Sequence, residues 1–223
     1  MLSRKKILEY FDADVIDMPI HVVGCGAIGS HIAELLVRIG CTNIHLYDFD
    51  TVEPHNITNQ MFIHSDIGQL KVDAVEAYMK AINPECNIKK HPEGLQPPYK
   101  LSGHVFLCVD NIDLRREICE KNRYNRFIKS ISDYRMRLTD AQFYFADWSD
   151  EDQIEDFIAS MQFSHEEATA ATPTSACGTE LSVVYTVKVV TCVGIHNFIC
   201  FIQGNPTNPV VIVDMKELAI GLV

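Results

Sequence analysis

Three glycines close together mark the part of this sequence that is best suited to hold a phosphate. Gly24, Gly26 and Gly29 follow an apolar run at residues 20–23. Glycines at this G-x-G-x-x-G spacing allow a tight turn, let the backbone approach a phosphate closely, and let the next helix pack against the strand. The free N–H groups at the start of that helix, from Ala27 onward, would point at the phosphate. The turn therefore predicts a nucleotide-binding site.

A set of polar residues follows the turn, and their types also suit a nucleotide. Asp48 lies about 20 residues after the last glycine, where a carboxylate can accept hydrogen bonds from ribose hydroxyls. Lys71 in such a setting can neutralise phosphate charge. The other members of the set are Asp50, Asn56 and Gln60. The glycine turn and Asp48 alone would suit a dinucleotide, but a dehydrogenase has no use for the others as a set.

A second pair of polar residues, Asp110 and Asn111, directly follows the apolar run at 104–109. Ligands of open α/β folds bind at the carboxyl ends of the strands. We therefore expect this pair at the same sheet edge as the glycine turn. The alternative is that Asp110 caps the next helix, which begins near Ile112.

One of the eight cysteines, Cys177, lies just before a long apolar segment at 181–202 that we expect to be a helix. The dipole and free N–H groups of a helix N-terminus lower the pKa of a thiol and favour the thiolate. Cys177 is therefore the candidate nucleophile. The alternative is a small buried residue, since a free cysteine packs as a hydrophobe.

Taken together, these motifs resemble those of the ThiF/MoeB family, the nucleotide-binding domain shared with ubiquitin-activating enzymes. That family carries G-x-G-x-x-G, a D-x-D at the end of the second strand, an N-x-x-R-Q segment, a lysine and a later Asp-Asn pair. The resemblance spans roughly residues 1–200. The matching residues are Gly24, Gly26, Gly29, Asp48, Asp50, Asn56, Gln60, Lys71, Asp110 and Asn111.

The resemblance implies an ATP-dependent adenylyltransferase. Such an enzyme activates the C-terminal glycine carboxylate of a ubiquitin-like or sulfur-carrier protein with a Gly-Gly tail as an acyl-adenylate. It implies that the glycine turn holds the α-phosphate, that Asp48 and Asp50 bind the ribose, and that Lys71 and Asn56 stabilise developing charge. Asp110 would hold Mg²⁺.

Two further roles are implied by the resemblance alone. In the family, a cysteine before the same late helix attacks the activated adduct, which would place a thioester or persulfide on Cys177. Arg4 matches an arginine that reaches the phosphates of the partner subunit, so a homodimer is expected. The alternative for Arg4 is a solvated cation on the surface of an N-terminal helix.

The sequence departs from the family pattern at one position. In N-x-x-R-Q the family arginine neutralises the outer phosphates of ATP, and Asn59 stands at that position here. A neutral amide supplies no charge, and charge-assisted hydrogen bonds are roughly twice as strong as neutral ones. We expect either that Arg4 of a second subunit compensates, or that the activity is reduced or altered.

Alternating strands and helices would position these residues. The alternation predicts an α/β fold with a Rossmann-like, mostly parallel sheet, flanked by helices, whose later strands are antiparallel. The length favours a single domain over 1–223, with a mobile crossover segment at about 147–176. Strands are predicted at 20–23, 44–47, 86–91, 104–109, 127–132, 138–146 and 210–213. Helices are predicted at 2–11, from the glycine turn to Gly40, at 66–83, from 112 onward, at 156–163 and at 181–202.

The composition argues against several other classes. A formal net charge of −11 disfavours a nucleic-acid partner, which needs a basic surface. The cysteines form no C-x-x-C pair, so no structural zinc is expected. The first residues lack an apolar signal segment, and a reducing cytoplasm is the expected location. Segment 181–202 contains Lys188 and His196, which favours a buried or interface helix over a membrane span.

Two other functions stay open on the sequence. The first is an NAD-dependent oxidoreductase, the class of enzyme in which a G-x-G-x-x-G turn is ordinarily found. A non-catalytic subunit of a split activating pair would explain Asn59 as a sign of degeneration.

Overall fold

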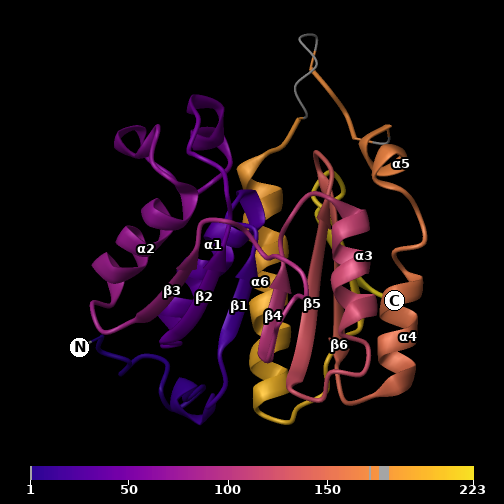
Figure 1. The fold of residues 1–223 in the computed structure, drawn as a ribbon, viewed down its shortest axis with the longest axis horizontal. Coiled ribbons are helices and arrows are strands. Elements are labelled where there is room, and N and C mark those ends of the chain that lie inside the picture. The colour runs from indigo at the N-terminus through magenta and orange to yellow at the C-terminus, as the bar shows by residue number, and fades with distance from the viewer. Residues whose placement is uncertain (1, 171, 176–180) are drawn as a thin grey trace.

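One sheet forms the centre of the molecule. The computed structural model describes residues 2–170, 172–175 and 181–223. Within these ranges an eight-stranded sheet has the order β3-β2-β1-β4-β5-β6-β7-β8 (Figure 1). Its strands are β1 (Ile20–Val23), β2 (Asn43–Tyr47), β3 (Asn87–His91), β4 (Gly103–Leu107), β5 (Ile128–Met136), β6 (Asp140–Asp147), β7 (Val210–Asp214) and β8 (Ala219–Leu222).

The sheet has a parallel half and an antiparallel half. Strands β3, β2, β1, β4 and β5 pair in parallel, and β6, β7 and β8 pair antiparallel to their neighbours. The predicted fold class is therefore confirmed. The α-helices are α1 (Ala27–Ile39), α2 (Lys71–Ile82), α3 (Ile112–Lys121), α4 (Glu151–Ala159), α5 (His165–Ala170) and α6 (Val184–Ile202).

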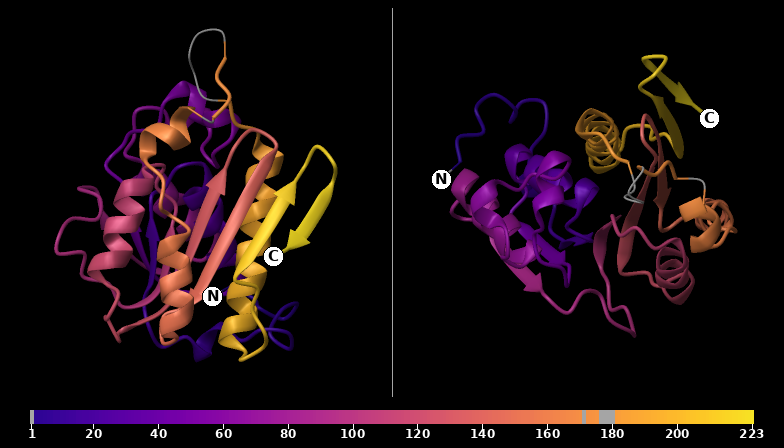
Figure 2. Two further views of the ribbon diagram at one scale, coloured as in Figure 1. Left: turned by 90° about the vertical axis from the view of Figure 1, so that its right-hand side faces the viewer. Right: turned by 90° about the horizontal axis from the view of Figure 1, so that it is seen from above.

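Helices cover both faces of the sheet, so each face has its own core (Figure 2). Successive side chains of a strand point to opposite faces, and β1 shows the consequence. Val22 packs in the core with Ile32 of α1 and Phe198 of α6. Its neighbour Val23 packs in the second core, beneath Ile112 of α3 and also beneath α4. Because both faces of β1 are buried, three of its four residues are apolar, and its one polar residue, His21, is buried with its Nδ1 2.9 Å from the Tyr47 hydroxyl.

Helix α6 is the long apolar segment that the sequence predicted. Among the described residues it alone is long and apolar enough to span a membrane by length and composition. Here it packs against α1 and crosses β6 and β5, and half of its most apolar window is buried. Its exposed side carries Tyr185, Lys188, Cys192 and His196.

Several predicted elements were wrong or incomplete. Residues 2–11 do not form a helix; two turns, closed by the carbonyls of Arg4 and Ile7, take their place. Helix α2 begins at Lys71 rather than at 66, because the Asp66 side chain closes a 3-10 turn by accepting a hydrogen bond from Ile63 N. Strand β8 was missed because its residues are exposed and do not alternate; pairing with β7 forms it.

The first part of the expected crossover segment is a packed helix. Helix α4 begins at Glu151 because the Asp150 side chain accepts hydrogen bonds from the backbone of the first turn. Trp148, Ile154 and Phe157 are buried, and the Trp148 indole donates to Asn122 O at 2.9 Å. The helix thus lies earlier than the predicted 156–163. Whether the rest of the segment moves stays a prediction.

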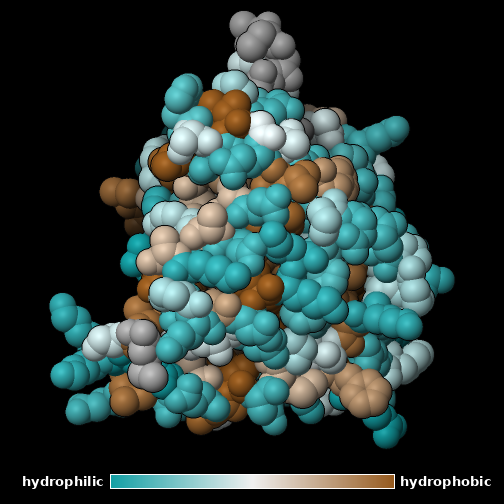
Figure 3. All heavy atoms as spheres, turned by 60° about the vertical axis from the view of Figure 1, so that its left-hand side comes forward, coloured by the Kyte–Doolittle hydropathy of each residue, from teal (hydrophilic) through white to brown (hydrophobic). Residues whose placement is uncertain are grey.

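One face of the surface is mostly hydrophilic. Hydrophilic side chains dominate the face that Figure 3 shows, and hydrophobic ones appear there in separate small areas. Scattered exposed hydrophobic residues of this kind are normal for folded proteins.

Candidate nucleotide-binding site

The predicted site residues leave the sheet at one edge. Val23 of β1 pairs with Tyr47 of β2 and with Leu107 of β4, and all three strands run in the same direction. The segments that follow them, 24–29, 48–50 and 108–111, therefore start side by side. The tertiary structure brings the glycine turn, both strand-two carboxylates and the Asp-Asn pair together, as the sequence predicted.

The glycine turn is held tightly on one side and open on the other. A Cβ atom on Gly24 would lie 2.7 Å from the carbonyl carbon of Cys108, and Gly24 has a φ of +95°. A Cβ atom on Gly29 would lie 1.8 Å from the carbonyl oxygen of Gly24. A Cβ atom on Gly26 would meet nothing within 4 Å. Gly26 caps α1 without any side-chain hydrogen bond to the first N–H groups of the helix, which leaves those groups able to bind a phosphate.

Asp48 joins the glycine turn to the end of β2. One carboxylate oxygen accepts a hydrogen bond from Cys25 N at 2.6 Å, and the other accepts from Asp50 N at 2.8 Å. Burial raises the pKa of the Asp48 carboxyl, and these two backbone donors work against that rise. The Asp48 side chain thus connects the glycine turn to the segment after β2, and it is also a candidate acceptor for ribose hydroxyls.

Lys71 lies against Asp50 at the start of α2. Its ammonium is 2.7 Å from the Asp50 carboxylate, and its backbone N–H also donates to Asp50 O at 2.9 Å. The lysine side chain is 9% exposed, whereas that of Asp50 is 51% exposed. The pair therefore places a buried cation behind an accessible carboxylate at the site edge.

Asn56 and Gln60 lie in the segment between β2 and α2. Asn56 is buried, and its side-chain oxygen accepts a hydrogen bond from Glu53 N at 2.9 Å, which closes the 3-10 helix Pro54–Thr58. The side-chain oxygen of Gln60 is buried and has no hydrogen-bond partner among the described residues. Buried polar atoms are normally paired, so this oxygen marks a place for an outside donor.

Asp110 and Asn111 take different roles. Asn111 is the N-cap of α3, and its side-chain oxygen accepts a hydrogen bond from Leu114 N at 2.9 Å. Asp110 is exposed and makes no side-chain hydrogen bond or ion pair with any described residue. The alternative that Asp110 caps the helix is therefore wrong, and its carboxylate is available to a ligand.

The structure does not bring Arg4 to the site of its own chain. Its guanidinium lies 3.1 Å from Asp12 and 2.5 Å from Asp14, and these carboxylates raise its pKa. Its aliphatic stem packs at Gly40, where α1 ends. Since α1 starts at the glycine turn, its far end lies at the opposite edge of the sheet. A role for Arg4 in a partner's site stays a prediction.

Cys177 lies outside the described residues, so its role also stays a prediction. Among the described cysteines, Cys25, Cys108 and Cys119 are buried at or near the site, and burial raises the pKa of each thiol. Those three are held as neutral thiols. The described residues contain no cluster of three or more His, Cys, Asp or Glu side chains that would hold a metal on its own.

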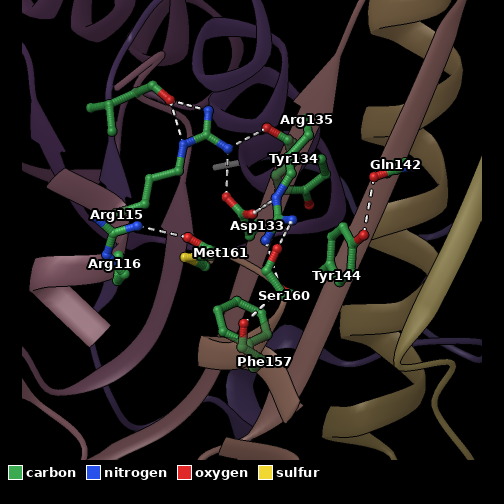
Figure 4. Close-up of polar contacts among 11 residues, drawn as sticks. Arg115, Arg116, Asp133, Tyr134, Arg135, Gln142, Tyr144, Phe157, Ser160 and Met161 are labelled. Atoms are coloured by element: carbon green, nitrogen blue, oxygen red, sulfur yellow. Dashed lines mark hydrogen bonds and ion pairs between the residues drawn. The ribbon is translucent and has the colours of Figure 1, made fainter. Parts of the chain in front are cut away.

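Sequence reasoning missed one buried group beside the site. The structure joins Arg115 of α3 to Asp133 and, through that carboxylate, to Arg135 (Figure 4). The Asp-x-Arg pattern follows the predicted strand 127–132 and lies within β5 (Ile128–Met136) in the structure. It is a weak signal, because only the fold shows that both charges are buried.

Comparison with known proteins places this site in a family. The yeast (Saccharomyces cerevisiae) tRNA threonylcarbamoyladenosine dehydratase 2 is 33% identical over 143 residues, which is 58% of this chain and 32% of that protein. The ubiquitin-like modifier-activating enzyme 5 of Drosophila mojavensis is 30% identical over 155 residues, which is 59% of this chain and 38% of that protein. The chain thus spans about a third of the length of these curated relatives.

Solved structures share the fold. The Escherichia coli MccB crystal structure with ATP matches with a TM-score of 0.71 at 16% identity, covering 95% of this chain and 65% of that one. The PaaA crystal structure matches with a TM-score of 0.69 at 15% identity, covering 93% and 64%. The model of the ThiF family matches residues 8–217. The chain therefore belongs to the ThiF family.

Proposed function

We propose that this protein is an ATP-dependent adenylyltransferase that activates the C-terminal carboxylate of a small carrier protein or peptide. A carboxylate oxygen of the carrier would attack the α-phosphorus of ATP, and pyrophosphate would leave. Family membership and the ATP-bound structural neighbour support this reaction class. The observation that carries it is the open glycine turn at the same edge as Asp110, an exposed carboxylate that no other described residue pairs with.

The residues at this edge fit ATP. The open side of Gly26 lets a phosphate approach the start of α1 without meeting a side chain. Asp48 and Asp50 stand at the end of β2, where they can accept hydrogen bonds from ribose hydroxyls. Asn56 lies in the 3-10 helix Pro54–Thr58 that follows β2, and Lys71 is the first residue of α2. Positioning and charge neutralisation by such groups do most of the work in this kind of reaction.

Asp110 fits Mg²⁺. Magnesium is usually bound by one or two protein carboxylates together with substrate phosphates and water, rather than by a complete protein cage. A single exposed carboxylate that has no partner within 2–170, 172–175 and 181–223 meets that requirement. When bound, the metal would neutralise phosphate charge.

The charge balance makes that neutralisation important. Lys71 is already paired with Asp50, and Asn59 contributes no charge where the family arginine stands. The described site residues therefore supply little net positive charge of their own. We expect ATP to bind weakly in EDTA and much more tightly with Mg²⁺.

A small protein or peptide is the favoured target. The named relatives include an enzyme that activates ubiquitin-like modifiers, and MccB was crystallised with the peptide MccA. The relative named for a tRNA modification raises a nucleic-acid alternative. The net charge of −11 disfavours that alternative, because phosphate backbones are held by basic surfaces.

Exchange of pyrophosphate into ATP tests the proposal. Peptides that end in Gly-Gly, and candidate carriers, should support exchange with Mg²⁺, whereas the same peptides with an amidated C-terminus should not. Calorimetry should show binding of ATP with Mg²⁺ in preference to NAD. Tight binding of NAD without ATP binding would favour the oxidoreductase, and ATP binding without exchange would favour a non-catalytic subunit.

A second step at Cys177 and a homodimer belong to the same proposal. Cys177→Ala should keep pyrophosphate exchange and lose any thioester to the carrier; a retained thioester would place the nucleophile elsewhere. The exposed side of α6 offers a dimer surface, with Tyr185 half-exposed on it. In that dimer, Arg4 of one subunit would serve the site of the other.

A further inference from the structure

A buried arginine holds the backbone that carries Asp110. The Arg115 Nε donates a hydrogen bond to Val109 O at 2.6 Å, and its Nη2 donates to the same oxygen. Its Nη1 donates to Asp133 Oδ1 and to Tyr134 O, each at 2.6 Å (Figure 4). The side chain of Arg115 is 7% exposed.

Asp133 orients that guanidinium directly and is itself held by a second arginine. Its side chain is fully buried, and its other oxygen accepts from Arg135 Nε at 2.6 Å. Arg135 is held in turn by the carbonyl and hydroxyl oxygens of Ser160, at 2.7 and 2.8 Å, and its guanidinium lies 3.9 Å from the centre of the Tyr144 ring. The side chains of Asp133, Arg135 and Ser160 thus all have hydrogen-bond partners, and a polar network satisfied in this way is rigid.

The position of Asp110 depends on its neighbours in the backbone. The carboxylate of Asp110 is exposed and forms no hydrogen bond or ion pair with the described residues that would fix it. On one side, Asn111 is fixed by its cap on α3. On the other side, the carbonyl of Val109 is fixed by Arg115. The turn is therefore held at both ends by side chains, and Arg115 supplies the end next to the sheet.

We propose that Arg115 is a positioning residue for Asp110, with Asp133 and Arg135 orienting its guanidinium. The inference rests on the proposed function, since it assigns to Arg115 the placing of the carboxylate that would meet Mg²⁺ and ATP. Arg115 itself touches neither ligand. It acts by keeping the Val109 carbonyl, and so the direction of the Asp110 side chain, fixed before a ligand arrives.

The geometry requires arginine rather than lysine. A planar guanidinium presents several N–H groups in a fixed fork, and here the fork spans Val109 O, Asp133 and Tyr134 O. A lysine ammonium keeps the charge and can stay paired with Asp133, but it is a point charge on a flexible stem. Arg115→Lys can therefore keep the ion pair with Asp133 while it loses the hydrogen bonds to Val109 O.

The chain offers a matched control on the same helix. Arg116 is adjacent in sequence, and its guanidinium bonds to Met161 O, Phe163 O and Asp113 rather than to Val109. Arg116→Lys repeats the same chemical change without touching the Asp110 turn. Thermal unfolding of each variant shows whether the fold is kept.

The experiment compares ATP affinity with Mg²⁺ and in EDTA, by calorimetry on the full chain. The wild-type protein and Arg116→Lys should gain affinity on addition of Mg²⁺. In Arg115→Lys that gain should fall by about 10-fold or more, as for other outer-shell changes at metal sites, while affinity in EDTA stays the same. In an Asp110→Ala background, Arg115→Lys should have no further effect on the gain.

The outcomes are distinct. A wild-type Mg²⁺ gain in Arg115→Lys, or an equal loss of affinity with and without Mg²⁺, would overturn the inference while leaving the proposed function in place. Absence of ATP binding by the wild-type protein would remove both. If Arg115→Lys does not fold, Arg135→Lys replaces it, because it loosens Asp133 without removing Arg115; an unchanged Mg²⁺ gain in that folded variant would count against the inference.

Discussion

The ammonium of Lys71 lies 2.7 Å from the carboxylate of Asp50, with the lysine buried and the aspartate half-exposed. The sequence placed both residues in the site, but only the structure shows that they form one unit. A buried, paired lysine side chain has little freedom to change its position when a phosphate binds. It stands at a fixed place at the start of α2, next to the end of β2.

Replacing Lys71 tests this unit. Lys71→Met keeps the length of the side chain and removes the charge, so a phosphate loses a charge-assisted hydrogen bond worth about 1.5–3 kcal/mol. We expect ATP affinity with Mg²⁺ to fall by at least about 10-fold, measured by calorimetry. Lys80→Met, on the exposed side of α2, is the control, and it should bind ATP as the wild type does. Equal affinity in Lys71→Met would exclude Lys71 from phosphate binding.

Substitutions at Asp110 and at its neighbour Asn111 should have different effects, the first on activity and the second on stability. Asp110 is exposed and unpaired in the part of the chain that the structure describes, and substitutions at such surface positions usually alter stability by less than about 0.5 kcal/mol. Asp110→Ala should therefore unfold like the wild type and lose pyrophosphate exchange. Asn111→Ala should lose about 1 kcal/mol of unfolding free energy, because it removes the cap of α3. Unchanged exchange in Asp110→Ala would place the metal ligand elsewhere.

The glycine turn offers a second matched pair. At Gly24, with a φ of +95°, a Cβ atom would be forced against the backbone of Cys108, so Gly24→Ala should be destabilised by about 1–2 kcal/mol or more. At Gly26 the added methyl group meets no protein atom. Gly26→Ala should keep the stability of the wild type and bind ATP more weakly, because the methyl group would occupy the space for the phosphate. Wild-type ATP affinity in Gly26→Ala would mean that the phosphate lies elsewhere.

Buried histidines predict that the fold weakens in mild acid. Burial lowers the pKa of His21 to about 3, and the pKa values of His45 and His104 to about 4. The unfolded chain binds these protons near pH 6.5, so stability is complete above that pH and falls as the pH drops toward 4. Each fully buried histidine contributes at most about 1.4 kcal/mol per pH unit.

Thermal unfolding between pH 7.5 and 5 measures this dependence. His104 donates to or accepts from Ser130 Oγ at 2.9 Å, and His104→Gln keeps a polar group there while removing the titration. The variant should show a smaller fall in melting temperature across this range than the wild type. His64→Gln, at an exposed position, is the control and should leave the slope unchanged. A flat wild-type profile would contradict the prediction.

Much of the fold followed from local patterns. Buried strands such as β1 are mostly apolar, and Gly40 stops α1 because it adopts the left-handed conformation that favours glycine. Where local and tertiary signals disagreed, the prediction failed. Residues 2–11 have a helical pattern of apolar residues, yet they form turns, with Phe11 in the core and Arg4 bound to two acids.

The sequence by itself determined which residues gather at the site. Each follows a parallel strand, and parallel strands bring their carboxyl ends to one edge, so Gly26, Asp48 and Asp110 had to meet there. Residue types and spacing were enough, because the positions of these residues depend on the direction of the strands.

The tertiary structure alone decided how those residues are held. Lys71 is paired with Asp50 across two segments, and the Asp110 turn is fixed by Arg115, whose partner Asp133 lies on another strand. Such contacts depend on burial and on distances between side chains that are far apart in sequence. A pattern of residue types carries no information on either, since the same charged residues on a surface would be solvated.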